Sequence, residues 1–298
     1  FIEFNEWERD IINHPVFQRL RRIRQLAWTD MVYPGASHTR FEHSIGVMHV
    51  ATRMFQNILH RSENILKNEV NYKDGGLDRV LALIRICSLL HDIGHAPFSH
   101  AGEDLFPPSV SGKRYDHEAY SAEAIALMED VIRHPTNEKN YGITVEDIRD
   151  LLNGDVSDES RLLWRTLLSS QLDADRADYL LRDAHHIGVA YGHYDLDRFV
   201  STLTIAIDPE TEAPVLAVEE GGWHAAEGFI LARYMMFTQV YFHKTRRAYD
   251  FHFSETMKSF LREEPSVGDQ IQDCFPPPTI VPRAWNRYDK RRDFFPDI

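Results

Sequence analysis

Apolar residues recur at every third or fourth position along most of the chain. This spacing constrains the fold more than any other feature, because it is typical of amphipathic α-helices. It predicts helices over residues 14–28, 42–59, 77–92, 117–132, 144–153, 160–182 and 223–260. Residues 203–220 instead alternate around a turn that contains Pro, Asp and Thr, and they predict a β-hairpin. We therefore expect a mostly α-helical bundle with one small β-hairpin.

The domain organisation predicted from the sequence is simple. No internal repeat and no convincing interdomain linker is visible, so we expect one domain over residues 1–262. Residues 263–298 are rich in Pro, Arg and Lys and have weak periodicity, and we interpret them as a segment that could belong to a truncated C-terminal region. The chain also lacks an initiator Met, so it could be a fragment of a longer protein.

Composition limits the classes of function. The formal net charge of −13 argues against binding of duplex nucleic acid, because such binding relies on a basic surface. No run of eighteen apolar residues is present and the N-terminus lacks the order of a signal peptide, so we expect no membrane partner. Two cysteines, Cys87 and Cys274, cannot form a disulfide framework and fit a reducing compartment, from which we expect a cytoplasmic protein.

The stretch "LLHDIGHAPFSH" places three histidines within ten residues, directly after an apolar helical run. Its adjacent pair His91 and Asp92 combines an imidazole and a carboxylate, which together suit a divalent metal such as Mn, Fe, Zn or Mg. Two ligands are too few for a tight site, and the candidates for the others are His43 and an aspartate of "LDADRADYLLRD". Such a set leaves metal positions open for water and substrate, as a hydrolase requires.

Longer strings in the same order resemble one family. They are "PGASHTRFEHSIGV", "LLHDIGHAPFSHAGE", "YDHEA", "LDADRADYLLRDAHHIG" and "YFHK". Together they resemble the HD-domain metal-dependent phosphohydrolases, and among them the deoxynucleoside triphosphate triphosphohydrolases of the SAM-and-HD-domain and dGTPase-like type. The likeness runs from about Asn13 to Phe253. It implies an HD-domain helical bundle with a divalent metal held by His43, His91, Asp92 and Asp175, and Mg bound with the triphosphate.

The resemblance also assigns catalytic roles. It implies that His95 and His117 are acid/base or nucleophilic residues and that Glu103 pairs with His117. A carboxylate partner raises the pKa of a histidine, which can then protonate a leaving oxygen at neutral pH. Family members often have Asp where this chain has Glu103, so the carboxylate here reaches one methylene further.

A third set of positions is expected to contact the substrate. By the resemblance these are Gln25, Leu26, Arg40, His100, Arg176, Tyr179, Asp183, Arg233 and Tyr241. The arginines would bind phosphate through their planar forks. Asp183 and Gln25 would hydrogen-bond a 3′-hydroxyl, and Tyr179 under C2′ would leave no room for a 2′-hydroxyl. Tyr241 would pack on the base.

The activity implied is hydrolysis of a deoxynucleoside triphosphate (dNTP) to deoxynucleoside and inorganic triphosphate, with water attacking the α-phosphorus. The resemblance also implies a homo-oligomer, a dimer or higher, and leaves room for a nucleotide activator. Two alternatives stay open. The chain could be another HD-type phosphoesterase, such as a nuclease or nucleotide phosphatase, or a catalytically silent nucleotide sensor.

Overall fold

The computed structural model describes residues 1–68, 76–108, 112, 114–154 and 159–263. Its α-helices are α1 (Glu6–Asn13), α2 (Pro15–Gln18), α3 (Arg40–Asn68), α4 (Gly76–Leu90), α5 (His100–Glu103), α6 (His117–Ala126), α7 (Glu129–Ile132), α8 (Pro135–Asn140), α9 (Val145–Asn153), α10 (Glu159–Arg165), α11 (Ala174–Ile187), α12 (Leu196–Ser201), α13 (Trp223–Met236) and α14 (Lys244–Glu263). Two strands, β1 (Leu203–Ile207) and β2 (Pro214–Val218), pair antiparallel. The expected mostly helical fold with one small hairpin is confirmed.

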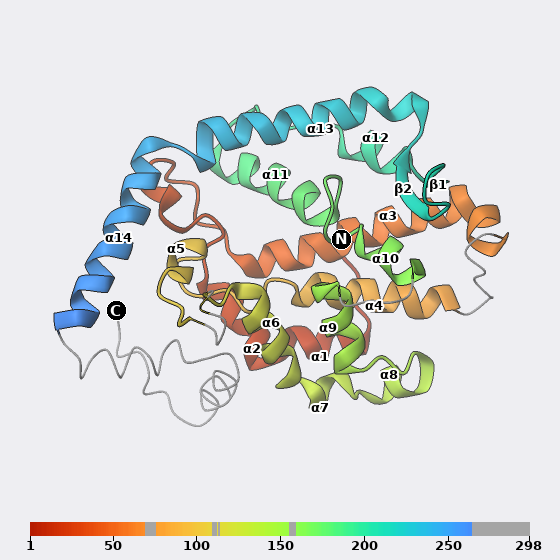
Figure 1. The fold of residues 1–298 in the computed structure, drawn as a ribbon, viewed down its shortest axis with the longest axis horizontal. Coiled ribbons are helices and arrows are strands. Elements are labelled where there is room, and N and C mark those ends of the chain that lie inside the picture. Colours follow the sequence, from red (N-terminus) through yellow and green to blue (C-terminus); the bar gives the residue numbers. More distant parts are fainter. Residues whose placement is uncertain (69–75, 109–111, 113, 155–158, 264–298) are drawn as a thin grey trace.

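Helix α3 runs through the middle of the molecule and contacts α4, α11 and β1 (Figure 1). Helices α11 and α13 pack on one side of it, and α1, α2 and α6 to α9 gather beyond α4 on the other. The hairpin lies against α3, where Ser62 interrupts the helical backbone. The Ser62 hydroxyl accepts a hydrogen bond from the Ile205 backbone N–H at 3.0 Å, which ties the hairpin to this interruption.

Two main clusters of buried apolar side chains stabilise this arrangement. The first, the α1–α9 core, includes Trp7, Phe17, Leu90, Ile93 and Ile148. The second, the α11–α13 core, includes Phe55, Ala174, Ala177, Leu180 and Phe229. Full burial of a large apolar side chain contributes about 1.5–3 kcal/mol, so each cluster is a major source of stability.

The single helix predicted over residues 14–28 is wrong. His14 has extended backbone angles, and Pro15 follows it as the first residue of α2, because proline lacks the N–H that a continuing helix would need. After a 3₁₀ turn over Arg19–Arg22, residue Ile23 is also extended. Its carbonyl accepts from the backbone of Arg40 at 2.9 Å, so the chain pairs with a distant segment instead of continuing as a helix.

Three other predicted helices are divided. Residues 117–132 form α6 and α7, and residues 160–182 form α10 and the first part of α11. Helix α11 starts anew because the Asp173 carboxylate caps it by accepting from the Arg176 backbone N–H at 2.8 Å. Residues 223–260 form α13, a π-helical turn over Phe237–Tyr241 and α14. The turn redirects the chain, and α14 descends along the edge of the bundle (Figure 1).

The segment that we interpret as a C-terminal region lies, from residue 264 onward, outside the described residues. None of the helices in the described ranges has both the length and the apolar character needed to cross a membrane.

Candidate active site

His43 lies in the first turn of α3. The helix begins here because the Thr39 backbone N–H donates to the Glu42 carboxylate at 3.1 Å, which satisfies a group that a helix end leaves unpaired. The His43 ring is 1% exposed. Its Nδ1 donates to Asp178 Oδ2 at 2.8 Å, and its Nε2 lies 3.0 Å from Asp175 Oδ1.

His91 and Asp92 follow the last residue of α4. His91 Nδ1 donates to the Ser88 carbonyl at 2.8 Å, which leaves the lone pair of the ring on Nε2. That Nε2 is buried and has no hydrogen-bond partner among the described residues. It lies 3.8 Å from Asp175 Oδ1 and 3.5 Å from Asp92 Oδ1. An unpartnered imidazole lone pair beside two carboxylates is the arrangement that a cation would satisfy.

These residues fit a divalent metal. His43, His91 and Asp175 each offer a ligand atom, and the three atoms lie within 4.8 Å of one another. Asp92 lies beside them, with Oδ2 3.7 Å from His43 Nε2, and it is also bonded to the Arg40 guanidinium. The group combines imidazole nitrogen with carboxylate oxygen, a donor set common to zinc, iron and manganese sites.

The pKa shifts of His43 and Asp175 indicate that a positive charge is favoured between the carboxylates of this group. Burial alone lowers the pKa of His43, but hydrogen bonds to Asp175 and Asp178 outweigh it and raise that pKa to about 10. Burial raises the pKa of Asp175, but its hydrogen bond to His43 lowers that pKa by more, so the net shift is downward. A proton therefore sits on His43 between carboxylates, and a bound metal would take its place.

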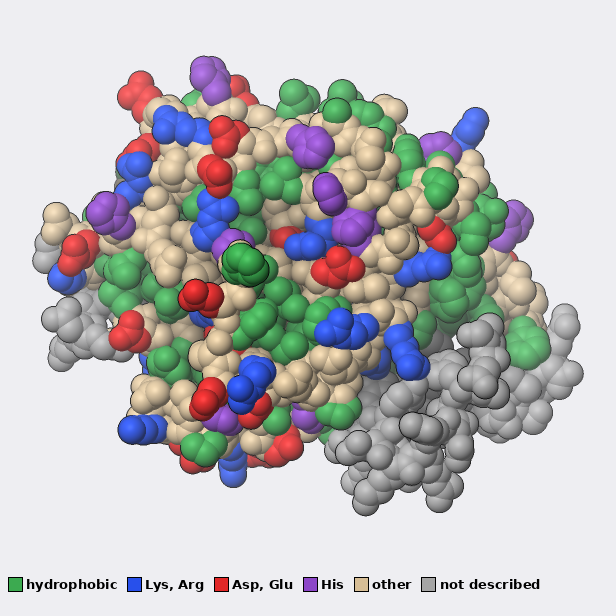
Figure 2. All heavy atoms as spheres, turned by 180° about the vertical axis from the view of Figure 1, so that it is seen from behind, with side chains coloured by type: hydrophobic (Ala, Val, Ile, Leu, Met, Phe, Trp, Pro, Cys, Tyr) green, Lys and Arg blue, Asp and Glu red, His purple; other side chains and the backbone are tan. Residues whose placement is uncertain are grey.

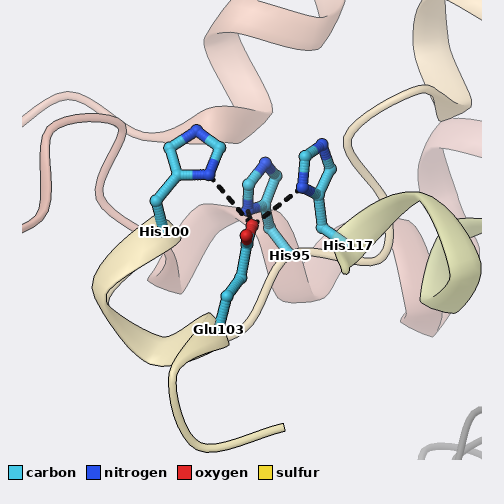
Figure 3. Close-up of side chains that lie close together, drawn as sticks. All are labelled: His95, His100, Glu103 and His117. Carbon is cyan, nitrogen blue, oxygen red and sulfur yellow. Dashed lines mark hydrogen bonds and ion pairs between the residues drawn. The ribbon is translucent and has the colours of Figure 1, made fainter. Parts of the chain in front are cut away.

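A second group contains His95, His100, Glu103 and His117 (Figure 3). Glu103 Oε1 accepts from His117 Nδ1 at 2.8 Å and from His100 Nδ1 at 2.9 Å, and it lies 3.7 Å from His95 Nδ1. The rings of His95 and His117 stack with their centroids 3.9 Å apart.

Gly94 explains why His117 reaches this group. A Cβ at Gly94 would lie 2.2 Å from the His117 carbonyl oxygen, so only glycine lets α6 approach the turn after α4. The Ser121 hydroxyl fixes the contact, since it accepts from the Gly94 N–H at 2.9 Å and donates to the His91 carbonyl at 2.9 Å.

The two groups are connected through His95. Its Nε2 lies 3.3 Å from Asp92 Oδ1, so one imidazole joins Asp92 to the neighbourhood of Glu103. Burial and the nearby Arg40 charge hold the pKa of His95 well below its usual range. Burial also lowers the pKa of His117, but its bond to Glu103 outweighs this and the net shift is upward. One neutral and one more basic imidazole therefore lie side by side.

A single stripe of α11 carries several of the predicted residues. Asp175, Tyr179 and Asp183 are spaced four residues apart and so lie on one face of the helix, with a rise of about 6 Å between neighbours. Asp183 Oδ2 accepts from the Tyr241 hydroxyl at 2.7 Å, and its Oδ1 lies 2.8 Å from His38 Nε2. Three predicted positions, Tyr179, Asp183 and Tyr241, thus lie along this stripe or against it. Gln25 is linked to it through His38, which contacts Asp183.

Gln25 and Leu26 follow a segment that pairs with the chain before α3, where Arg24 is bridged to Thr39. The Gln25 backbone N–H donates to the His38 carbonyl at 3.0 Å. The Gln25 side-chain oxygen is buried without a hydrogen-bond partner within the described part of the chain. Leu26 is 9% exposed.

The three arginines predicted to bind phosphate occupy different surroundings. Arg40 is buried and bonds to Asp92 and to the Ser99 hydroxyl. Arg176 bonds to Asp173 and lines, with His91, Asp92 and Asp175, a cavity of about 210 Å³. Arg233 is on α13, where it donates to the Gln171 side chain at 2.7 Å. Only Arg40 directly contacts one of the predicted metal ligands.

Three contributors were missed in the sequence. Asp178 orients His43, His38 contacts Asp183, and Ser99 accepts from Arg40. Asp178 lies three residues after Asp175, a spacing that placed it near the site but gave no sign of its partner. Ser99 and the preceding Phe98 have φ of 56° and 67°, an uncommon conformation that sequence patterns do not predict.

One face of the molecule carries histidines together with side chains of both charges. Figure 2 shows several histidine side chains on one face, with acidic and basic side chains between them. Besides the metal-binding group, the cavity is lined by Arg149 and Arg165 as well as Arg176, so part of its wall is basic.

Comparison with known proteins agrees with the geometry. The family model described as "HD domain" matches residues 40–183, and the one described as "HD associated region" matches residues 194–274. The uncharacterized protein YwfO of Bacillus subtilis is 35% identical over 239 residues, which are 80% of this chain and 48% of that protein. The chain therefore spans about half the length of the first curated relatives it matches.

Two further comparisons concern proteins whose names describe an activity. The chicken deoxynucleoside triphosphate triphosphohydrolase SAMHD1 is 31% identical over 214 residues, 64% of this chain and 33% of that protein. The crystal structure of a phosphohydrolase from Bacteroides thetaiotaomicron superposes with a TM-score of 0.69 at 31% identity and covers 90% of this chain and 58% of that one. The matched ranges contain both histidine groups, and the chain belongs to the HD-domain phosphohydrolase family.

Proposed function

We propose that this protein hydrolyses deoxynucleoside triphosphates to deoxynucleoside and inorganic triphosphate, with water attacking the α-phosphorus. The observation that carries the proposal is the stripe of Asp175, Tyr179 and Asp183 along α11. It runs from the metal-binding group to a hydrogen-bonded Asp–Tyr pair, so a reacting phosphate and a sugar can be held by one rigid element.

A divalent cation held by His43, His91, Asp92 and Asp175 would polarise a phosphoryl oxygen and lower the pKa of a bound water. The other groups of the chain would manage protons and charge. Glu103 raises the pKa of His117, so His117 is the acid we propose to protonate the departing 5′-oxygen. Neutral His95 would keep this acid in place by stacking on its ring. Arg40 would offset charge on the phosphate.

The sugar would be recognised beside Tyr179. Its ring lies 6.0 Å from that of Tyr241 in an edge-to-face arrangement, and Tyr241 donates to Asp183. We propose that Asp183 and the Gln25 side-chain oxygen, which has no hydrogen-bond partner among the described residues, hydrogen-bond a 3′-hydroxyl, and that Tyr179 blocks a 2′-hydroxyl. His100, Arg176 and Arg233 would contact the phosphates.

The similarity to SAMHD1 supports this substrate class, because that protein is named as a deoxynucleoside triphosphate triphosphohydrolase. The net charge of −13 favours a small nucleotide over a polymer backbone as substrate. We further propose that residues 1–262 act as one catalytic domain in a cytoplasmic homo-oligomer of two or more subunits.

Product identity tests the reaction. The full chain, loaded with Mn²⁺, Fe²⁺, Zn²⁺ or Mg²⁺, is incubated with each of the four dNTPs, singly and mixed, and the products are separated by ion-exchange chromatography. We expect inorganic triphosphate and deoxynucleoside, and no turnover by His91→Ala. Activity only in mixtures would indicate a nucleotide activator. Release of pyrophosphate and monophosphate would refute the attack and leaving-group assignment. Degradation of a single-stranded oligonucleotide that is lost in His91→Ala would favour a nuclease instead.

Sugar selection has a separate test. Tyr179→Ala should raise kcat/KM for a ribonucleoside triphosphate relative to its deoxy counterpart, because the ring no longer occupies the space of a 2′-hydroxyl. Tyr234→Ala is the control, since Tyr234 is 62% exposed on α13. Unchanged discrimination in Tyr179→Ala would remove this residue from the role.

A further inference from the structure

Four side chains of the second group converge on one point. Nδ1 of His117, His100 and His95 lie 2.8, 2.9 and 3.7 Å from Glu103 Oε1. The four ligand atoms are all within 4.8 Å of one another. The three rings surround the carboxylate with their Nδ1 atoms turned toward it (Figure 3). Three imidazole nitrogens and one carboxylate oxygen are a donor set that zinc and other late divalent metals prefer.

One of these nitrogens has no hydrogen-bond partner among the described residues. His95 is 1% exposed, and its Nδ1 makes no hydrogen bond in the part of the chain that the structure describes. Its Nε2 faces Asp92 Oδ1 at 3.3 Å, so the proton of the ring belongs on Nε2 and the lone pair on Nδ1. A carboxylate that fixes the far nitrogen of a histidine is the usual support of a metal-binding imidazole. A cation near Glu103 would satisfy this buried lone pair.

The distances between the ligand atoms suit a tetrahedral ion, although one of the two stacked rings, His95 or His117, has to rotate so that both lone pairs meet at it. Tetrahedral zinc with bonds of about 2.0–2.1 Å needs ligand atoms about 3.3 Å apart. The distances from Glu103 Oε1 to the three Nδ1 atoms, 2.8 to 3.7 Å, lie on both sides of that value. The His100 side chain is 62% exposed and belongs to α5, a helix of four residues, so it can open a path from solvent and close over an ion.

We propose that His95, His100, Glu103 and His117 form a second transition-metal site, separate from the group of His43, His91 and Asp175 and joined to it through Asp92 and His95. Zinc is the probe that suits its donors. Occupation would remove the hydrogen bond between Glu103 and His117 and should therefore inhibit. This consequence for catalysis rests on the proposed function, whereas metal binding itself does not.

The experiment measures zinc per chain. The full chain is stripped with a chelator, dialysed against buffered Zn²⁺ and analysed by inductively coupled plasma mass spectrometry. We expect about two zinc ions per wild-type chain and about one in His91→Ala. His100→Ala and His117→Ala should each raise the Kd of the second ion by more than about tenfold. Co²⁺ in His91→Ala should give the intense visible bands of a four-coordinate site.

The chain supplies a matched control. His224 Nδ1 lies 2.9 Å from Glu227 Oε2 at a spacing of three residues, as His100 does from Glu103, but His224 is 95% exposed. His224→Ala should leave both zinc ions bound. The His100 side chain is largely exposed, so His100→Ala gives a readout even if His117→Ala fails to fold.

Two results would overturn the second site. One is a wild-type chain that binds a single zinc ion, lost in His91→Ala. The other is a second ion whose Kd is the same in wild type and in His100→Ala. Triphosphate release with one equivalent of metal is measured separately, so failure of the proposed activity and failure of this site give different results.

Discussion

Replacing Asp178 by Asn should weaken metal binding although Asp178 is not itself a predicted ligand. The Asp178 carboxylate accepts from His43 Nδ1 at 2.8 Å and from the Arg182 guanidinium at 2.8 Å, and its side chain is 8% exposed. The carboxylate makes the His43 ring a better donor through Nε2 and fixes its orientation. Asparagine keeps the shape but removes the charge.

The magnitude follows from this contact. Loss of a carboxylate that supports a metal-binding histidine costs about 10- to 100-fold in affinity, or about 1.4–2.7 kcal/mol. The same substitution weakens a charged hydrogen bond to Arg182, which should lower the free energy of unfolding by about 1.5–3 kcal/mol. Since domains are stable by about 5–15 kcal/mol, we expect the variant to fold.

The assay is equilibrium dialysis of chelator-stripped protein against Zn²⁺ or Mn²⁺, with circular dichroism to confirm folding. Asp197→Asn is the matched control, because Asp197 pairs with Arg53 at 2.5 Å but is 87% exposed and forms no ion pair with a histidine among the described residues. A folded Asp178→Asn protein whose metal Kd equals that of the control would refute the reasoning, since it would show that the His43 partner has no influence on the metal.

Three further predictions use the same region. Gly46→Ala should also lower metal affinity, because a Cβ there would lie 1.9 Å from Asp178 Oδ1 and displace that carboxylate. Equilibrium dialysis measures the affinity, and a wild-type Kd would contradict the prediction. Asp175→Ala should abolish turnover and reduce bound metal, measured by product release and metal content, and wild-type metal content would exclude Asp175 as a ligand. Glu103→Gln should move the basic limb of the pH profile of kcat/KM to lower pH. The reason is that burial still lowers the pKa of His117, whereas the carboxylate that raised it is gone. An unmoved limb would show that the pKa of His117 does not set the pH dependence of activity.

The sequence predicted that His43, His91 and Asp175 lie close together, and the structure confirms it. His91 and Asp92 directly follow an apolar helix whose buried face the pattern reveals. Asp175 lies in the first turn of α11, and the sequence singled it out only through the resemblance. Once α3, α4 and α11 pack together, the ends that carry these residues lie close. Local pattern and tertiary packing agree at the end of α4, whereas the start of α11 depends on the Asp173 cap, which the periodic pattern does not reveal.

The break near Ile23 could not be predicted in the same way. Residues 14–28 have the helical period, but the backbone of Ile23 pairs with Arg40, which is distant in sequence. A periodic pattern reports which side chains face the core and contains nothing about such pairing. The same limit applies to Asp178 and His38, whose roles depend on partners on other elements.

The position of the metal-binding group between the two cores has a consequence for the whole molecule. His91 and Asp92 lie between Leu90 and Ile93 of the α1–α9 core, whereas Asp175 follows Ala174 of the α11–α13 core. An ion bound by these ligands would link the α1–α9 core to the α11–α13 core. At a concentration of a thousand times its Kd, it would add about 4.1 kcal/mol to the free energy of unfolding. Supply of the metal would then control how long the protein persists in the folded state, as well as whether it can react.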